Sequence, residues 1–143
     1  MNHILIADDE ESIGSLLRAT LEGPESRITH AATGPEALLL VQQHKFDLII
    51  LDWMMPGKSG IDVLRELRQR PETAAIPIIM LTARGQMKDQ ELALRLGAVG
   101  YLMKPFSPLE LLEKVSKILS AQKERKESPV AASEAQGKQV TLQ

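Results

Sequence analysis

Short, almost uninterrupted apolar runs alternate along the chain with longer segments in which apolar residues recur every three or four positions. Four of the short runs suit strands of a parallel sheet that helices cover on both faces. A fifth segment, residues 27–32, mixes polar and apolar side chains and suits a strand at the edge of a sheet. The four apolar runs cover residues 4–7, 48–51, 76–81 and 99–103.

Five helical patterns lie between and after these runs. The first spans residues 13–21, the fourth runs from about residue 86 to 96, and the last spans residues 111–119. Gly97 suits the C-terminal cap of the fourth helix. The N-terminal caps we expect are Thr33 and Ser107, each with a Glu three residues later as in a capping box, and Ser59 before the third helix.

Strands that alternate with helices predict an α/β fold, a doubly wound parallel sheet of five strands flanked by five helices. Placing the polar second strand at an edge is consistent with the order 2-1-3-4-5 of flavodoxin-like folds. We expect one domain over residues 2–122. Residues 123–143 turn charged and then small and polar, which predicts a tail or linker.

The composition excludes several classes of protein. Seventeen basic and 19 acidic residues give a net charge of −2, and only 3% of residues are aromatic, so neither a basic nor a base-stacking nucleic-acid surface is expected. The absence of cysteine excludes disulfides and thiolate metal sites. No apolar run reaches the roughly 18 residues of a membrane span, and we expect a cytoplasmic protein.

Polar and charged residues stand where four of the predicted strands end. Asp8 and Asp9 follow the first strand, Asp52 the third, Thr82 the fourth and Lys104 the fifth. Because ligands of a doubly wound sheet bind at the carboxyl ends of its strands, we expect these side chains to converge. Neighbouring carboxylates repel one another, and oxygen ligands without His or Cys suit a hard cation, above all Mg²⁺.

This combination suits phosphoryl transfer, in which positioning and charge neutralisation provide most of the catalysis. Asp52 is the expected nucleophile and would form an aspartyl phosphate. The cation, Lys104, the Thr82 hydroxyl and the neighbouring backbone N–H of Ala83 would each contact a phosphoryl oxygen.

Each residue taken singly also has an ordinary structural role. Asp8 and Asp9 are typical N-terminal helix caps, and Asp52 suits a turn. Thr82 suits another cap, and Lys104 an exposed turn residue. Four such coincidences at one sheet edge are much rarer than any one of them, so a shared site is the favoured interpretation.

Four motifs in this order resemble the receiver domain of two-component response regulators, the CheY-like family. They are Asp-Asp-Glu at residues 8–10, Leu-Asp-Trp-Met-Met-Pro-Gly at 51–57 with Gly60, Leu-Thr-Ala at 81–83 and Lys-Pro-Phe at 104–106. The separations of 43 residues from Asp9 to Asp52, 30 to Thr82 and 22 to Lys104 are similar to the family's spacing.

The resemblance implies that Asp52 accepts a phosphoryl group from a phosphohistidine on a sensor histidine kinase or phosphotransfer protein. It implies that Asp9, Asp52 and the Met54 backbone carbonyl bind Mg²⁺ directly, with Mn²⁺ as a substitute, while Asp8 acts through water. It also implies that the peptide bond before Pro105 is cis.

The resemblance further implies a switch. Thr82 would move toward the phosphoryl group and Tyr101 would follow it. The surface of the fourth helix, fifth strand and fifth helix would then change and control a partner or an output domain; dimerisation on phosphorylation is left open. Met54 and Arg84, each two residues after a site residue, are expected to set the dephosphorylation rate, and their character predicts a long-lived phosphoryl state.

One alternative comes from a different class, a Mg²⁺-dependent phosphohydrolase of the haloacid dehalogenase type. That family also uses Asp, Thr and Lys with Mg²⁺, but it places a second Asp two residues after its nucleophile, where this chain has Met54. We therefore expect a phospho-accepting receiver and not an enzyme with an external substrate. Whether the receiver stands alone or is part of a longer protein is left open.

Overall fold

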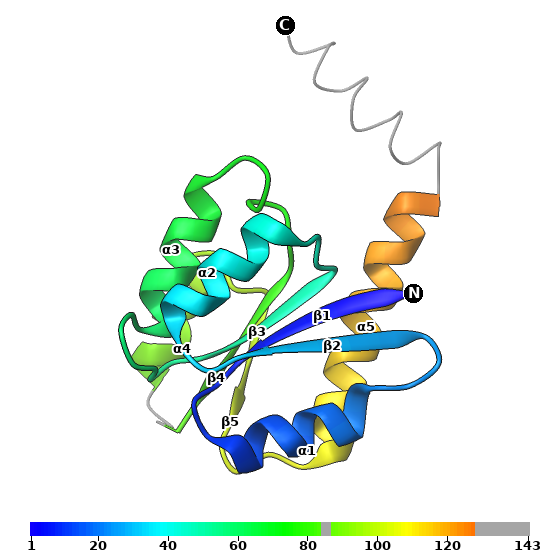
Figure 1. Ribbon diagram of the computed structural model, residues 1–143, viewed down its shortest axis with the longest axis horizontal. Coiled ribbons are helices and arrows are strands. Elements are labelled where there is room, and N and C mark those ends of the chain that lie inside the picture. The colour runs from blue at the N-terminus through cyan, green and yellow to red at the C-terminus, as the bar shows by residue number, and fades with distance from the viewer. Residues whose placement is uncertain (84–86, 128–143) are drawn as a thin grey trace, which may run out of the picture.

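Strands and helices alternate strictly in the computed structural model, which describes residues 1–83 and 87–127 (Figure 1). The strands are β1 (Asn2–Ala7), β2 (Ser26–Ala31), β3 (Leu48–Asp52), β4 (Ile78–Thr82) and β5 (Gly100–Met103). The helices are α1 (Glu11–Leu21), α2 (Gly34–Gln43), α3 (Gly60–Gln69), α4 (Met87–Arg95) and α5 (Pro108–Glu127).

The five strands form one parallel sheet in the order β2-β1-β3-β4-β5. This is the predicted order, with the polar strand β2 at one edge. Helices α1 and α5 cover one face, and α2, α3 and α4 cover the other (Figure 1). All three central strands are buried almost throughout, as their continuous apolar sequences require.

Helix ends follow the local sequence. The side-chain oxygens of Thr33, Ser59 and Ser107 accept hydrogen bonds from the backbone N–H three residues later, at 3.1, 3.3 and 3.0 Å. At the other end of α4, Gly97 adopts φ of 112°. The N–H groups of Gly97 and Ala98 donate to carbonyls of the last helical turn, which is the Schellman arrangement. These predicted caps are confirmed.

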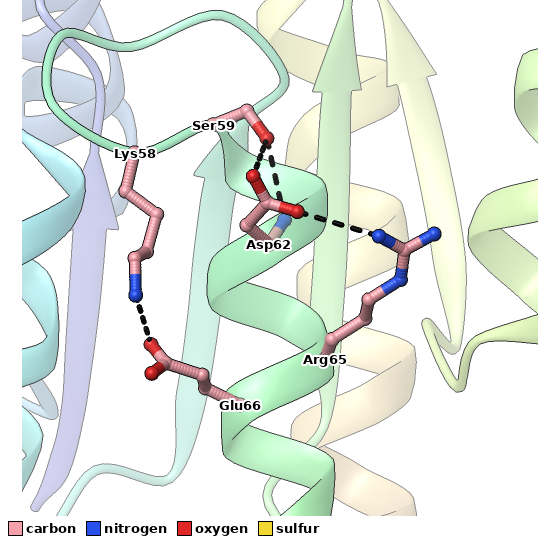
Figure 2. Close-up of polar contacts among 5 residues, drawn as sticks. All are labelled: Lys58, Ser59, Asp62, Arg65 and Glu66. Carbon is pink, nitrogen blue, oxygen red and sulfur yellow. Dashed lines mark hydrogen bonds and ion pairs between the residues drawn. The ribbon is translucent and has the colours of Figure 1, made fainter.

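The loop between β3 and α3 is fixed on the helix that follows it (Figure 2). Lys58 Nζ lies 2.8 Å from Glu66 Oε2, and Asp62 contacts both Ser59 and Arg65. The start of α3 also lies against the end of β3. Gly60 allows this contact, since a Cβ atom at position 60 would lie 2.0 Å from the backbone oxygen of Asp52. The loop after Asp52 is therefore held close to the strand end.

Several boundaries differ from the prediction, and two of the differences have a clear physical reason. Strand β4 begins at Ile78, not at residue 76, because Pro77 has no N–H to donate to the ladder. Helix α5 continues past residue 122 to Glu127, since Lys, Glu and Arg are good helix formers and carry the helix into the segment expected as a tail. No helix in the described part of the chain is long and apolar enough to span a membrane.

Candidate functional site

Four elements of the sheet bring one side chain each to its carboxyl edge. Asp8 follows β1, while Asp52 and Thr82 end β3 and β4, and all three are buried. Lys104 follows β5, and its Nζ atom lies 3.0 Å from Asp8 Oδ2 and 3.1 Å from Asp52 Oδ2. The sheet therefore gathers two acids and one ammonium group from three distant segments, as the sequence predicted.

A pocket of about 280 Å³ opens over this cluster. Residues from the loops after β1, β3, β4 and β5 line it, so the buried Asp52 carboxylate faces a space large enough for a small anion and its counter-ion. The lining residues are Asp9, Glu10, Asp52, Trp53, Met54, Thr82, Ala83 and Lys104.

Burial and charge oppose each other at Asp52. Burial raises the pKa of its carboxyl group to about 6; the contact with Lys104 lowers this pKa, and the negative charge of Asp8 raises it. Burial lowers the pKa of the Lys104 ammonium group, but its interactions with Asp8 and Asp52 outweigh that effect and hold the pKa above its ordinary value. An added cation would stabilise the ionised form of Asp52.

The donor atoms of the site fit a divalent cation. One carboxylate oxygen from each of Asp8, Glu10 and Asp52 lies within 4.8 Å of the others. Asp8 Oδ2 is buried, and the Lys104 ammonium group, 3.0 Å away, compensates its charge. An all-oxygen set of carboxylates around a partly buried pocket suits Mg²⁺ or Mn²⁺.

Glu10 is the residue that sequence reasoning missed. Its carboxylate lies 3.6 Å from Lys104 Nζ and joins the acidic cluster, whereas the exposed Asp9 lines the pocket from outside that cluster. The signal was present as three consecutive acids, but Glu10 could equally have been a surface residue at a helix start. Glu10 is in fact the N-terminal cap position of α1, without a side-chain cap bond.

The structure also places the other predicted residues that it describes. Met54 is exposed and lines the pocket. The Lys104–Pro105 peptide bond is cis, as the resemblance implied. Tyr101 is half-buried on β5, where Lys114 Nζ lies 5.3 Å from the centre of its ring. Arg84 lies outside the described residues.

The protein is a doubly wound α/β protein. Its pocket contains acids and a lysine and lies at the carboxyl ends of the strands, where the strand order reverses, which is where such folds bind small ligands. Residues 4–116 match the response regulator receiver domain. The chain belongs to this family, whose receiver domains are phosphorylation-activated switches of two-component systems.

Similar proteins agree with the family and the fold. The phosphate regulon transcriptional regulatory protein PhoB of Rhizobium meliloti (strain 1021) is 47% identical over 116 residues, 81% of this chain and 51% of PhoB. The transcriptional regulatory protein CpxR of Escherichia coli (strain K12) is 46% identical over 119 residues, 83% of this chain and 50% of CpxR. The chemotaxis response regulator CheY4 of Vibrio cholerae is 33% identical with a TM-score of 0.78, covering 82% of this chain and 98% of CheY4.

The chain spans about half the length of the curated relatives it matches. These relatives are signalling regulators and not phosphohydrolases, so the haloacid dehalogenase alternative is not supported.

Proposed function

We propose that Asp52 of this receiver accepts a phosphoryl group from a phosphohistidine of a sensor kinase or phosphotransfer protein. The observation that carries this proposal is the buried Asp52 carboxylate, 3.1 Å from Lys104 Nζ, facing a pocket lined by acids and by Thr82. An Asp52 oxygen attacks phosphorus, a P–O bond forms, and the P–N bond breaks with its electron pair remaining on the histidine nitrogen.

Asp52, Asp8 and Asp9, with the backbone carbonyl of Met54, would hold the divalent cation, and Glu10 adds a further carboxylate. A bound cation would neutralise charge on the phosphoryl oxygens. The chain itself would supply the other contacts: the Lys104 ammonium group is beside Asp52, and Thr82 and Ala83 line the same pocket, so the Thr82 hydroxyl and the Ala83 N–H are the proposed donors. Each can bind one phosphoryl oxygen.

The response to phosphorylation would pass through β4 and β5 to the surface of α4, β5 and α5. Thr82 pairs with Met103 across these strands, and Gln90 of α4 contacts Met103. Thr82 moving toward the phosphoryl group would free space for Tyr101 to follow. Exposed apolar side chains on and between these three elements support a docking role for a partner or output domain; they are Leu94, Val99, Met103, Leu109 and Leu112.

The test is mass spectrometry of the chain after incubation with acetyl phosphate and Mg²⁺. We expect a mass increase of one phosphoryl group, absent in Asp52→Asn and without Mg²⁺. Sizing of the modified protein would show whether phosphorylation changes its assembly. An Asp52→Asn protein that still gains the phosphoryl group would refute the assignment of the acceptor.

Loss of the phosphoryl group requires a water molecule in line behind the phosphorus, and Met54 lines the pocket in which that water would lie. A thioether orients water poorly, and the long side chain two residues after Thr82 would not orient it better, so the phosphorylated form should be long-lived. Met54→Asn adds a hydrogen bond to that water and should speed hydrolysis by about two- to tenfold, as one hydrogen bond allows. The decay of the phosphorylated mass over time measures it, and Met55→Asn, one residue further from the acceptor, is the control.

A further inference from the structure

The loop that carries Asp8, Asp9 and Glu10 forms hydrogen bonds with two successive residues of the edge strand β2, His30 and Ala31. The backbone N–H of Asp8 donates to the carbonyl of Ala31 at 3.0 Å, which simply continues the sheet ladder. The backbone carbonyl of Asp8 accepts a hydrogen bond from the Nε2 atom of His30 at 2.8 Å. The first bond is available to any sequence, whereas the second depends on the side chain at position 30.

The His30 bond fixes the peptide plane between Asp8 and Asp9. A carbonyl oxygen can only accept, so Nε2 of His30 carries the proton and donates it. On the other side of the loop, Asp8 Oδ1 accepts from the backbone N–H of Glu10 at 2.8 Å. The orientation of the Asp8–Asp9 peptide determines where the next two acidic side chains can point, so three hydrogen bonds hold the acid loop in one conformation.

Gly14 of α1 makes room for the His30 ring. A Cβ atom at position 14 would lie 3.0 Å from Nε2 and 3.2 Å from Cδ2 of His30. Glycine in the first turns of a helix lowers helix stability relative to alanine, so position 14 is unfavourable for α1 taken alone. It is favourable for the bond between His30 and Asp8.

We propose that His30, seated against Gly14, is a positioning residue for the cation site: it acts through the Asp8 carbonyl and does not touch the cation. This inference rests on the proposed function, because it assumes that the acids of the loop bind Mg²⁺. It assigns a role to the polar edge strand β2, which otherwise lies beside the site without contributing a side chain to it.

The experiment is a Mg²⁺ titration of the full chain, followed by the fluorescence of Trp53, the single tryptophan, which lines the pocket. His30→Leu removes the donor and should weaken Mg²⁺ binding about three- to tenfold, the range of one hydrogen bond. His30→Gln retains an N–H donor of similar reach and should restore affinity to within twofold of the original protein. His44→Leu, at the opposite end of the sheet, is the matched control.

Gly14→Ala gives the sharper test, because it should move stability and affinity in different directions. Alanine favours the helix, so the melting temperature should hold or rise, while the displaced His30 ring should weaken Mg²⁺ binding. Ser15→Ala, in the same helix and away from His30, should leave Mg²⁺ affinity unchanged.

Mg²⁺ affinities of His30→Leu and Gly14→Ala within twofold of the original protein would overturn this inference. Its failure is distinguishable from failure of the proposed function. If the original protein binds Mg²⁺ and Asp52→Asn does not, the site stands and only the role of His30 falls. If the original protein gives no Mg²⁺ response at all, both fall.

Discussion

Asp52 is an ionisable group held in a place that disfavours its charge. Its folded-state pKa of about 6 lies above the ordinary aspartate value of 3.8, so the folded protein binds the proton more tightly than the unfolded chain. The stability associated with the protonated form is fully present below about pH 3.8 and is lost as the pH rises through about 6. Ionised Asp52 therefore destabilises the metal-free fold at neutral pH.

Asp52→Asn should consequently raise the free energy of unfolding by about 1–3 kcal/mol at pH 7.5 without Mg²⁺. Urea unfolding monitored by circular dichroism measures this difference. The gain should shrink at pH 5, where the carboxyl group of the original protein is protonated, and also in Mg²⁺, which stabilises the ionised form. A variant less stable than the original protein at pH 7.5 would contradict the assigned electrostatics.

Glu10 shows how a single side chain can change the cation site without being needed to build it. It is more than half exposed, so solvent screens its charge. Glu10→Gln should weaken Mg²⁺ binding about two- to fivefold, because a nearby negative charge is lost from the acidic cluster. Glu11→Gln removes the same charge one residue further along and should have a smaller effect; equal effects would mean that only net charge matters.

At the scale of elements, α3 and α4 are joined through the C-terminal end of α4. The guanidinium group of Arg68 donates from Nε and Nη2 to the carbonyl of Gly97 at 3.1 and 2.8 Å. Burial lowers the pKa of this group. Gly97 itself has a backbone conformation that other residues rarely adopt, with φ of 112°.

Gly97→Ala should therefore destabilise the protein by about 1–3 kcal/mol, through backbone strain and the contact of the new Cβ atom with Arg68. Chemical unfolding gives the magnitude. The control is Gly23→Ala, where a Cβ atom would meet nothing within 4 Å, and we expect a change of less than about 0.5 kcal/mol there. Similar losses at both positions would argue against a specific role for the α4 cap.

Element ends whose signals are local could be predicted from the sequence. Ser59, Ser107 and Gly97 act within one helical turn, so their effect is readable from spacing alone. The end of α5 could not be predicted in this way, because a charged segment can be a solvated helix or a tail and the composition is the same in both cases.

At the scale of the whole molecule, a second cluster lies at the amino ends of the strands, away from the phosphoryl site. His3 contacts Thr29 through Nε2 at 2.6 Å and Arg27 through Nδ1 at 3.2 Å. Arginine can only donate, so Nδ1 accepts and the ring is neutral. Burial first, then the charges of Arg27 and His44, lower the pKa of His3.

Because the folded-state pKa of His3 is lowered, the unfolded chain binds a proton first as the pH falls. The resulting stability is present above about pH 6.5 and is lost below it. Protonation of Asp52 acts in the opposite direction over the same range, so the variant is compared with the original protein. Between about pH 6.5 and 5, the urea midpoint of His3→Gln should fall less, or rise more, than that of the original protein, even if its midpoint at pH 7.5 is lower. An identical change in both proteins would show that His3 does not titrate with unfolding; His44→Gln should alter this change less.

The amino-acid pattern was enough to place the strands and helices along the chain and to predict that Asp8, Asp52, Thr82 and Lys104 converge, and the polar second strand was consistent with the sheet order that the structure has. Apolar period identifies each strand, and parallel strands align their carboxyl ends, so the residue that ends each strand is placed automatically. These features need only local pattern and the geometry of a doubly wound sheet.

Folding in three dimensions was needed to show that Asp8 and Glu10, and not Asp9, turn into the acidic cluster, and that His30 holds the carbonyl of Asp8. Side-chain direction in a loop depends on backbone angles that hydrogen bonds from distant segments impose, and no spacing along the chain encodes them. The raised pKa of Asp52 likewise came from burial and from the nearby charge of Asp8, which together outweigh the lowering by Lys104, because desolvation and charge act through space.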